Sequence, residues 1–242
     1  MIEMMSKAGS YHTKQDMPNQ DAVLYDSDRR LTGLFLADGM SQCARASAGA
    51  RLSCEAMNNL LMKKGACFFS LEEPEIAEFA MSHVFHTLRG EAARAGEPVD
   101  DYGSTMACVL VDRRGGRMMT LNLGDGLIAG VRDGSLKILA MPDDASEGCC
   151  CTTTHGAARR TAVRFVDTRD LDEVFVCSDG AWRTLFDGGR MREEARQLLC
   201  HGSCAALAEY LRSADTFDDC SFISMDLKTN GGCGDERTRI LK

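Results

Sequence analysis

Four apolar segments follow one another closely between Thr105 and Ala140, in the sequence TMACVLVDRRGGRMMTLNLGDGLIAGVRDGSLKILA. The breaks between them contain glycine, which adopts the positive φ angles of tight hairpin turns. The breaks are Arg114-Gly115-Gly116, Gly124-Asp125-Gly126 and Asp133-Gly134. We therefore predict four antiparallel strands joined by hairpin turns, at Thr105–Asp112, Arg117–Leu123, Leu127–Arg132 and Leu136–Ala140.

Strands and helices are also predicted on both sides of this central region. Short apolar and β-branched runs predict strands at Asp21–Tyr25, Leu31–Ala37, Ala162–Val166, Glu173–Cys177 and Ser221–Leu227. Apolar residues at helical spacing predict helices at Ala44–Met62, Pro74–Ala95, Glu193–Leu199 and Cys204–Leu211. Because antiparallel hairpins dominate the middle, the expected fold class is α+β, with antiparallel sheets and helices packed outside them.

The composition of the chain predicts one globular domain. The chain has 242 residues, of which 44% are hydrophobic and 26% charged, and no Pro/Ser-rich linker divides it. We expect a single domain over residues 1–228 and a polar C-terminal tail over residues 229–242. The formal charge of −8 disfavours a non-specific nucleic-acid partner. The sequence has neither a membrane-length apolar run nor a basic-apolar leader at its start, so we expect a cytoplasmic protein with reduced thiols.

Acidic residues recur where apolar strands end. They stand in Asp38-Gly39, Asp125-Gly126, Asp179-Gly180 and Asp218-Asp219. One Asp-Gly pair after a strand usually forms a turn, and Asp133-Gly134 is interpreted in that way. Four strand-end acids can instead meet at one edge of a sheet, where buried anions repel one another unless a cation joins them. Carboxylate, carbonyl and water oxygens suit Mg²⁺ or Mn²⁺.

Six short motifs resemble, in order, those of the metal-dependent serine/threonine protein phosphatases of type 2C. They are Asn19-Gln20-Asp21-Ala22, Ala37-Asp38-Gly39-Met40, Gly103-Ser104-Thr105, Leu123-Gly124-Asp125-Gly126, Cys177-Ser178-Asp179-Gly180-Ala181-Trp182 and Asp218-Asp219-Cys220. The segment from Tyr11 to Asp21 is similar to the compact bacterial branch of that family. The resemblance implies a sandwich of two antiparallel sheets flanked by helices, in four α-β-β-α layers.

The resemblance also implies a metal site and its ligands. Asp38 is expected to bridge two Mn²⁺ or Mg²⁺ ions, and the carbonyl of Gly39 to bind one of them. Asp179 and Asp219 are expected to complete the shell of the first metal. Asp21 stands near the second metal with Gln20 as a further candidate, and Asp125 matches the position of a third, weaker metal.

The implied activity is hydrolysis of phosphoserine and phosphothreonine. Two such metals share a water and lower its pKa, which gives a nucleophile at neutral pH. Asp38 and Asp179 would hold that water, and the metals would neutralise the transferred phosphoryl group. The expected partner is a phosphorylated protein, in signalling opposed to a serine/threonine kinase, with no role for nucleic acid or membrane. The sequence does not identify the substrate.

Three departures from the family pattern leave two alternatives open. Asp16 stands where the family carries a phosphate-gripping Arg, Gln20 replaces a Glu, and Cys220 replaces an Asn. Lys14, His12 and Arg45 are the candidates to bind phosphate instead. These departures favour, as an alternative, a catalytically weak or inactive relative that binds phosphoproteins or regulatory partners. A hydrolase of small phosphate esters is a third hypothesis. The sequence assigns no role to the run Cys149-Cys150-Cys151.

Overall fold

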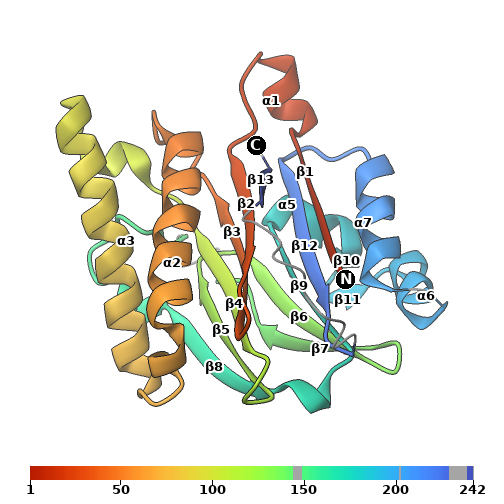
Figure 1. Cartoon of the computed structure of the whole chain (residues 1–242). Helices are drawn as coiled ribbons and strands as arrows, with labels where there is room; N and C mark the ends of the chain where they lie inside the picture. Colours follow the sequence, from red (N-terminus) through yellow and green to blue (C-terminus); the bar gives the residue numbers. More distant parts are fainter. Residues whose placement is uncertain (144–148, 202, 229–238, 242) are drawn as a thin grey trace.

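Two antiparallel sheets form the centre of the computed structural model, which describes residues 1–143, 149–201, 203–228 and 239–241 (Figure 1). The strand order is β13-β2-β3-β4-β5-β8 in the first sheet and β1-β12-β9-β6-β7 in the second. The strands of the first sheet are β2 (Asp21–Ser27), β3 (Leu31–Asp38), β4 (Met106–Asp112), β5 (Arg117–Leu123), β8 (Ala162–Asp167) and β13 (Arg239–Leu241). Those of the second are β1 (Ile2–Lys7), β6 (Leu127–Arg132), β7 (Ser135–Ala140), β9 (Glu173–Cys177) and β12 (Cys220–Asp226).

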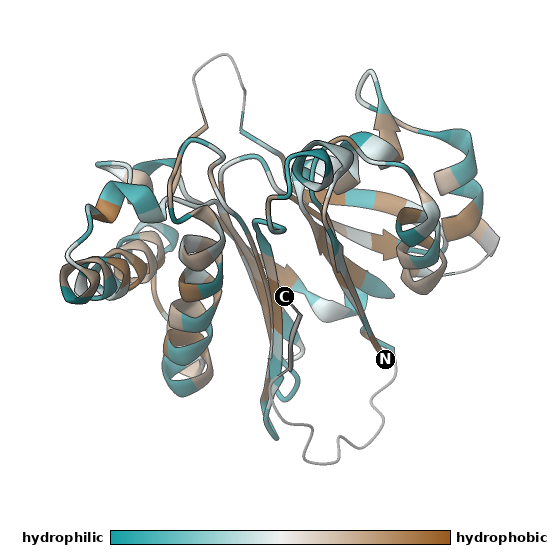
Figure 2. Cartoon of the chain, turned by 90° about the horizontal axis from the view of Figure 1, so that it is seen from above, coloured by the Kyte–Doolittle hydropathy of each residue, from teal (hydrophilic) through white to brown (hydrophobic). Residues whose placement is uncertain are grey.

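Helices cover the outer face of each sheet. The long helices α2 (Ala46–Phe68) and α3 (Glu73–Ala95) pack on the first sheet. The helices α5 (Asp179–Leu185), α6 (Glu193–His201) and α7 (Cys204–Ser213) pack on the second. Seen from above, the two groups of helices lie on opposite sides of the paired sheets (Figure 2). The short elements are α1 (Ser10–Lys14), α4 (Ala157–Arg160), the 3₁₀ turns η1 (Val99–Tyr102) and η3 (Thr168–Asp170), and the small hairpin of β10 (Phe186–Asp187) and β11 (Arg190–Met191).

Three apolar clusters hold these four layers together. One lies between α2, α3 and the first sheet and includes Phe35 and Leu88. A second lies between the two sheets and includes Val109 and Val176. The third lies between the second sheet and the C-terminal helices and includes Phe222. The predicted α+β sandwich with four layers is therefore confirmed. Because side chains of a strand alternate between faces, each central strand contributes to two of these clusters.

One predicted hairpin is wrong. The break Gly124-Asp125-Gly126 does not join paired strands, because β5 pairs with β4 and β8 while β6 pairs with β7 and β9. The segment instead carries the chain from the first sheet to the second, and Gly124 has a φ of 96°. Glycine is needed there, because a Cβ at Gly124 would lie 2.7 Å from a methyl carbon of Thr105. Asp125 thus stands where the chain crosses between the sheets.

The C-terminal tail contributes one strand that the sequence analysis did not expect. Arg239–Leu241 pairs antiparallel with β2, opposite Val23 to Tyr25. Most of the predicted tail, residues 229–238 and 242, lies outside the described residues, so the predicted domain boundary at residue 228 stays a prediction. No helix in the described part of the chain is long and apolar enough to cross a membrane.

Candidate metal centre

The first sheet brings two acids side by side. Asp21 is the first residue of β2 and Asp38 is the last residue of β3, and the antiparallel register pairs them directly. Gly39 follows, and its amide donates to the Gln20 carbonyl at 3.1 Å. A Cβ at Gly39 would lie 2.6 Å from the Ala46 carbonyl, so only glycine lets the chain pass so close to the start of α2.

The second sheet brings further acids to the same end of the sandwich. Asp179 begins α5 directly after β9, and the preceding Ser178 amide donates to the Ser221 carbonyl at 3.0 Å. Asp218 and Asp219 stand immediately before β12, the strand that pairs with β9. The helix α5 can start there because Gly180 has no side chain, since a Cβ would lie 2.2 Å from the Asp219 carbonyl oxygen.

Electrostatics shows that these carboxyl groups lie close to one another. Burial first, and then the charges of Asp21, Asp179, Asp125 and Asp218, raise the pKa of Asp38 well above its usual value. Burial also raises the pKa of Asp21 to about 8, although nearby serine hydroxyls oppose the shift. The pKa of Asp179 rises to about 6 for the same reason, with Asp125 and Asp218 adding to it. Groups with such shifts cluster at functional sites.

Several buried oxygens at this end have no hydrogen-bond partner of normal geometry. They are Oε1 of Gln20, both carboxylate oxygens of Asp21 and Oδ1 of Asp179. Buried oxygens without donors cost free energy, and a hard divalent cation is the ligand that this donor set prefers. The chemistry of these oxygen donors therefore suits Mg²⁺ or Mn²⁺.

One cation of the protein itself already lies at the centre. Arg183, one helical turn beyond Asp179, places its guanidinium 2.6 Å from Oδ2 of Asp179. Burial raises the pKa of Asp125, and the charge of Arg183 opposes part of that rise. Within the described residues, no group of three or more acids, histidines or cysteines is arranged to hold a metal ion. The ion pair with Arg183 occupies one carboxylate oxygen of Asp179.

Both oxygens of Asp219 have hydrogen-bond donors, and its charge helps to raise the pKa of Asp21. Asp219 is 2% exposed, and its Oδ1 accepts from the Gly9 amide at 2.8 Å while its Oδ2 accepts from the Gln20 amide at 2.6 Å. Nδ1 of His12, itself 3% exposed, lies 2.8 Å from Oδ1. Both oxygens of Asp219 therefore hold the segment between β1 and β2 against the strand β12. Its half-exposed neighbour Asp218 is the residue whose charge acts on Asp38 and Asp179.

The three predicted phosphate-binding residues lie in three different places. His12 is buried, and its ring lies against the carboxylate of Asp219. Lys14 lines a separate cavity together with Lys7 and Thr216. Arg45 lines the cavity beside Gln20 and Asp21, but its guanidinium is paired with Glu97. The structure thus does not bring the three together, and of the three only Arg45 lines the same cavity as Asp21.

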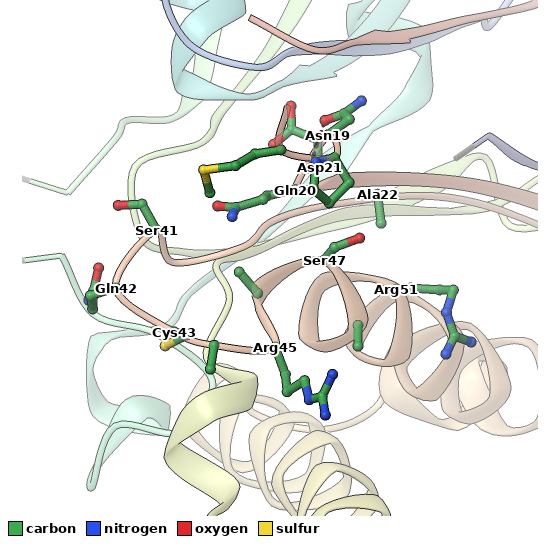
Figure 3. A pocket seen from close by; sticks show the side chains of 15 residues that line it. Asn19, Gln20, Asp21, Ala22, Ser41, Gln42, Cys43, Arg45, Ser47 and Arg51 are labelled. Atoms are coloured by element: carbon green, nitrogen blue, oxygen red, sulfur yellow. Dashed lines mark hydrogen bonds between the residues drawn. The ribbon is translucent and has the colours of Figure 1, made fainter. Parts of the chain in front are cut away.

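That cavity, of about 900 Å³, opens between the segment before β2 and the start of α2. Figure 3 shows Gln20 and Asp21 on one side, with Arg45, Ser47 and Arg51 on the other. Arg51 is paired within α2, with its guanidinium 2.8 Å from the carboxylate of Glu55. The cavity is therefore bounded by unpartnered oxygens on one wall and by arginines on the facing wall.

Two site residues were missed by the sequence analysis. The sequence predicts Asp219 as the ligand of the pair Asp218-Asp219, and it predicts no side-chain partner for Asp179. A signal for Arg183 was present, because residues four apart lie on the same face of a helix. The motif Asp218-Asp219-Cys220 contains two adjacent acids, and sequence alone does not tell which of them faces the site.

Comparison with known proteins agrees with the fold and with this arrangement of motifs. A family model described as Protein phosphatase 2C matches residues 8–214. Stp1, a serine/threonine phosphatase from Staphylococcus aureus, has a similar structure with 14% identity and a TM-score of 0.66, covering 93% of this chain and 94% of that one. The catalytic domain of the serine/threonine phosphatase PstP, solved with two manganese ions, has 20% identity and a TM-score of 0.65, covering 93% and 97%. No curated protein matches the sequence.

The fold and the family match together define the class of this protein. Two antiparallel sheets with helices on both outer faces, and acids gathered at one end, are the architecture that the motifs imply. The matched region covers most of the chain. The chain belongs to the protein phosphatase 2C family.

Proposed function

We propose that this protein is a metal-dependent phosphatase that hydrolyses phosphoserine or phosphothreonine in proteins. The observation that carries the proposal is the cluster of Asp21, Asp38 and Asp179 at one end of the sandwich, each with a raised pKa. Such a cluster binds a divalent cation in preference to remaining protonated, because the cation removes both the burial cost and the mutual repulsion. Family membership supports the same reaction class.

We propose that Asp38, Asp179 and Asp218 hold one ion, with Asp218 in the place expected for Asp219. The basis is that both oxygens of Asp219 already accept backbone hydrogen bonds, while the charge of Asp218 acts on Asp38 and Asp179. If the motif is aligned so that Asp218 is the metal ligand, then Asp219, instead of Cys220, occupies the position of the family's Asn. The departure from the family pattern is then an Asp in place of the Asn, at Asp219, and Cys220 lies beyond the motif.

A second ion would be held by Asp21 and Asp38, with the Gly39 carbonyl and the Gln20 amide oxygen as further ligands. When bound, such ions supply Lewis-acid activation of water and neutralise the charge on a transferring phosphoryl group. RsbX, a structural neighbour with 11% identity and a TM-score of 0.59, was solved with magnesium. Asp125, at the crossing between the sheets, is the candidate for a third and weaker ion.

The protein's own groups would orient the substrate. Arg45 and Arg51 lie on the cavity wall that faces Gln20 and Asp21, so they are placed to attract an anionic phosphopeptide. Arg45 would have to leave Glu97 to contact phosphate directly. Its guanidinium can form the bidentate contact that a phosphate prefers, which a lysine cannot.

A catalytically silent phosphoprotein-binding module is a second candidate function. The observation that favours it is Arg183, which holds Asp179 at 2.6 Å. If Arg183 keeps that place in solution at saturating Mn²⁺, the first ion cannot use both oxygens of Asp179. The two functions then differ in whether metal addition gives turnover.

Hydrolysis of para-nitrophenyl phosphate and of a phosphothreonine peptide, each titrated with Mn²⁺, tests the proposal. We expect metal-dependent turnover that the Asp38→Ala variant loses by at least a hundredfold, with the Glu78→Gln variant on the exposed face of α3 as the control. Metal binding by calorimetry without turnover on either substrate would favour the binding module. Turnover of small esters with none of the peptide would favour a small-molecule hydrolase.

A further inference from the structure

Two cysteine thiols from distant parts of the chain lie on the same side of Gly103. A Cβ built on Gly103 would lie 3.1 Å from the sulfur of Cys43 and 3.1 Å from the sulfur of Cys151. The two sulfurs are therefore separated by no more than twice that distance. Gly103 has no side chain, so no atom of its own fills the space between them.

The backbone explains why these thiols converge. The Met40 amide donates to the Gly103 carbonyl at 3.0 Å, which fixes the loop that carries Cys43 on one side. The Thr152 amide donates to the Ser104 carbonyl at 2.8 Å, which fixes the segment that carries Cys151 on the other side. Both segments thus flank the same short stretch of chain.

We propose that Cys43 and Cys151 form a peroxide-sensitive dithiol site that closes to a disulfide. Both residues are half-exposed, so an oxidant can reach them. Both lie outside the helices and strands, in irregular segments whose side chains and backbone can adjust. The sulfurs must still approach to about 2.05 Å, the length of a disulfide bond.

The other two cysteines of the Cys149-Cys150-Cys151 run are placed differently. The Cys149 thiol donates to the Cys150 carbonyl at 3.8 Å, and it lies close enough to Asp125 to affect the pKa of that acid. Cys150 is buried, with 4% of its surface exposed. Only Cys151 of the three is directed at Gly103 and Cys43, which gives the proposal a specific pairing.

The reaction balances with a hydroperoxide as the oxidant. One thiolate attacks an oxygen of hydrogen peroxide, the O–O bond breaks and a sulfenic acid forms as hydroxide leaves and takes up a proton. The second thiolate attacks the sulfenic sulfur and releases the second water. Two thiols are oxidised to one disulfide, and one peroxide is reduced to two waters.

The cross-link would join two segments that border the candidate metal centre. Cys43 lines the cavity beside Gln20 and Asp21 (Figure 3). The segment of Cys151 continues from Cys149, which contacts Asp125. On the proposed function, the disulfide therefore lowers hydrolysis of a protein substrate by restraining the segment of Cys43 at the cavity and the segment that leads from Asp125. A thiol reductant would restore it.

Peptide mapping of the full chain tests the site itself. The reduced protein is treated with hydrogen peroxide, blocked with N-ethylmaleimide and digested without reductant. We expect a linked pair of peptides containing Cys43 and Cys151, with a mass lower by two hydrogen atoms than the two thiol peptides. The Cys43→Ser and Cys151→Ser variants should lose it, and Cys67→Ser, which changes an exposed cysteine of α2, should keep it. A link through Cys149 or Cys150, or oxidation of Cys67 without any link to Cys43, would overturn the proposal.

Activity tests the consequence separately. Phosphopeptide hydrolysis should fall at least fivefold on peroxide treatment of the wild-type protein and return with dithiothreitol, while Cys43→Ser should be unaffected. A mapped cross-link with unchanged hydrolysis would refute the regulatory role and leave the site standing. A protein without any hydrolysis would refute the proposed function, while the mass measurement would still decide the dithiol site.

Discussion

Exchanging the two adjacent acids before β12 should separate a structural role from a metal-binding role. The carboxylate of Asp219 is buried and accepts hydrogen bonds from the Gly9 and Gln20 amides, and His12 lies against it. In Asp219→Asn, one oxygen becomes an NH₂ group that cannot accept. One of the two buried amides then loses its partner, which costs about 1–3 kcal/mol.

The same reasoning gives a shift that melting curves can resolve. For a domain of this size, 1 kcal/mol changes Tm by roughly 2–4 °C, so Asp219→Asn should lower Tm by about 2–12 °C. Asp219→Ala removes both acceptors and should lower it further. Asp218→Asn is the matched control, because that side chain is half-exposed and lies among like charges, so Tm should stay within about 2 °C of the wild type or rise.

Metal affinity should respond in the opposite way. Calorimetric titration with Mn²⁺ should show binding weakened at least tenfold in Asp218→Asn and by less than threefold in Asp219→Asn. Melting is measured with EDTA present, so that lost metal does not mimic lost hydrogen bonds. If Asp219→Asn melts like the wild type and fails to bind Mn²⁺, the assignment of the two acids is reversed and the reasoning is refuted.

Two further predictions concern charge at the centre. Replacing Arg183 by Gln removes the group that competes for Asp179, so Mn²⁺ should bind several-fold more tightly in a calorimetric titration. The control Arg196→Gln, on the exposed face of α6, should leave Mn²⁺ affinity unchanged. Weaker binding in Arg183→Gln would mean that Arg183 assists the site. In the folded protein the pKa of Asp21 is raised to about 8 and that of Asp179 to about 6. Above about pH 4, the metal-free folded protein therefore holds more protons than the unfolded chain. Its free energy of unfolding should fall as the pH rises from about 4 to 8. Urea unfolding in EDTA at pH 5.5 and 7.5 should show this loss, and saturating Mn²⁺ should reduce it; equal stability at the two pH values without metal would contradict the proposed burial of the acids.

Long, regular elements could be predicted from the sequence because their pattern is local. The predicted strands Arg117–Leu123, Leu127–Arg132 and Glu173–Cys177 have the bounds that the structure shows. The long helices were also found, although α2 continues past its predicted end at Met62 to Phe68. In such segments apolar residues recur at the period of the element, and burial of one face follows from that period alone.

Short elements were missed because tertiary contacts, instead of pattern, determine them. The strand β1 reads IEMMSK, with no alternation of apolar and polar residues, and it is held at the sheet edge by pairing with β12. The helix α5 has seven residues and begins at a site acid, so its sequence was interpreted as a motif. The crossing at Gly124 to Gly126 has the composition of a hairpin turn, and only the choice of strand partners distinguishes the two.

The uncertainty about Asp218 and Asp219 has a similar physical origin. Successive side chains of an extended chain point to opposite sides, so a shift of one residue in a motif exchanges the inward and outward acids. Composition is the same in both frames, and Asp-Asp therefore carries no information on which acid faces the proposed metal.

The deciding contacts come from the other end of the chain, where the Gly9 and Gln20 amides and His12 converge on Asp219. Those amides are backbone groups that every residue except proline carries, so their preference for Asp219 arises from the path of the segment between β1 and β2. The close approach of that segment depends on Gly9, at which a Cβ would lie 2.3 Å from the Asp218 carbonyl carbon. On the proposed assignment, the choice between the two acids thus depends on a glycine more than two hundred residues away in the sequence.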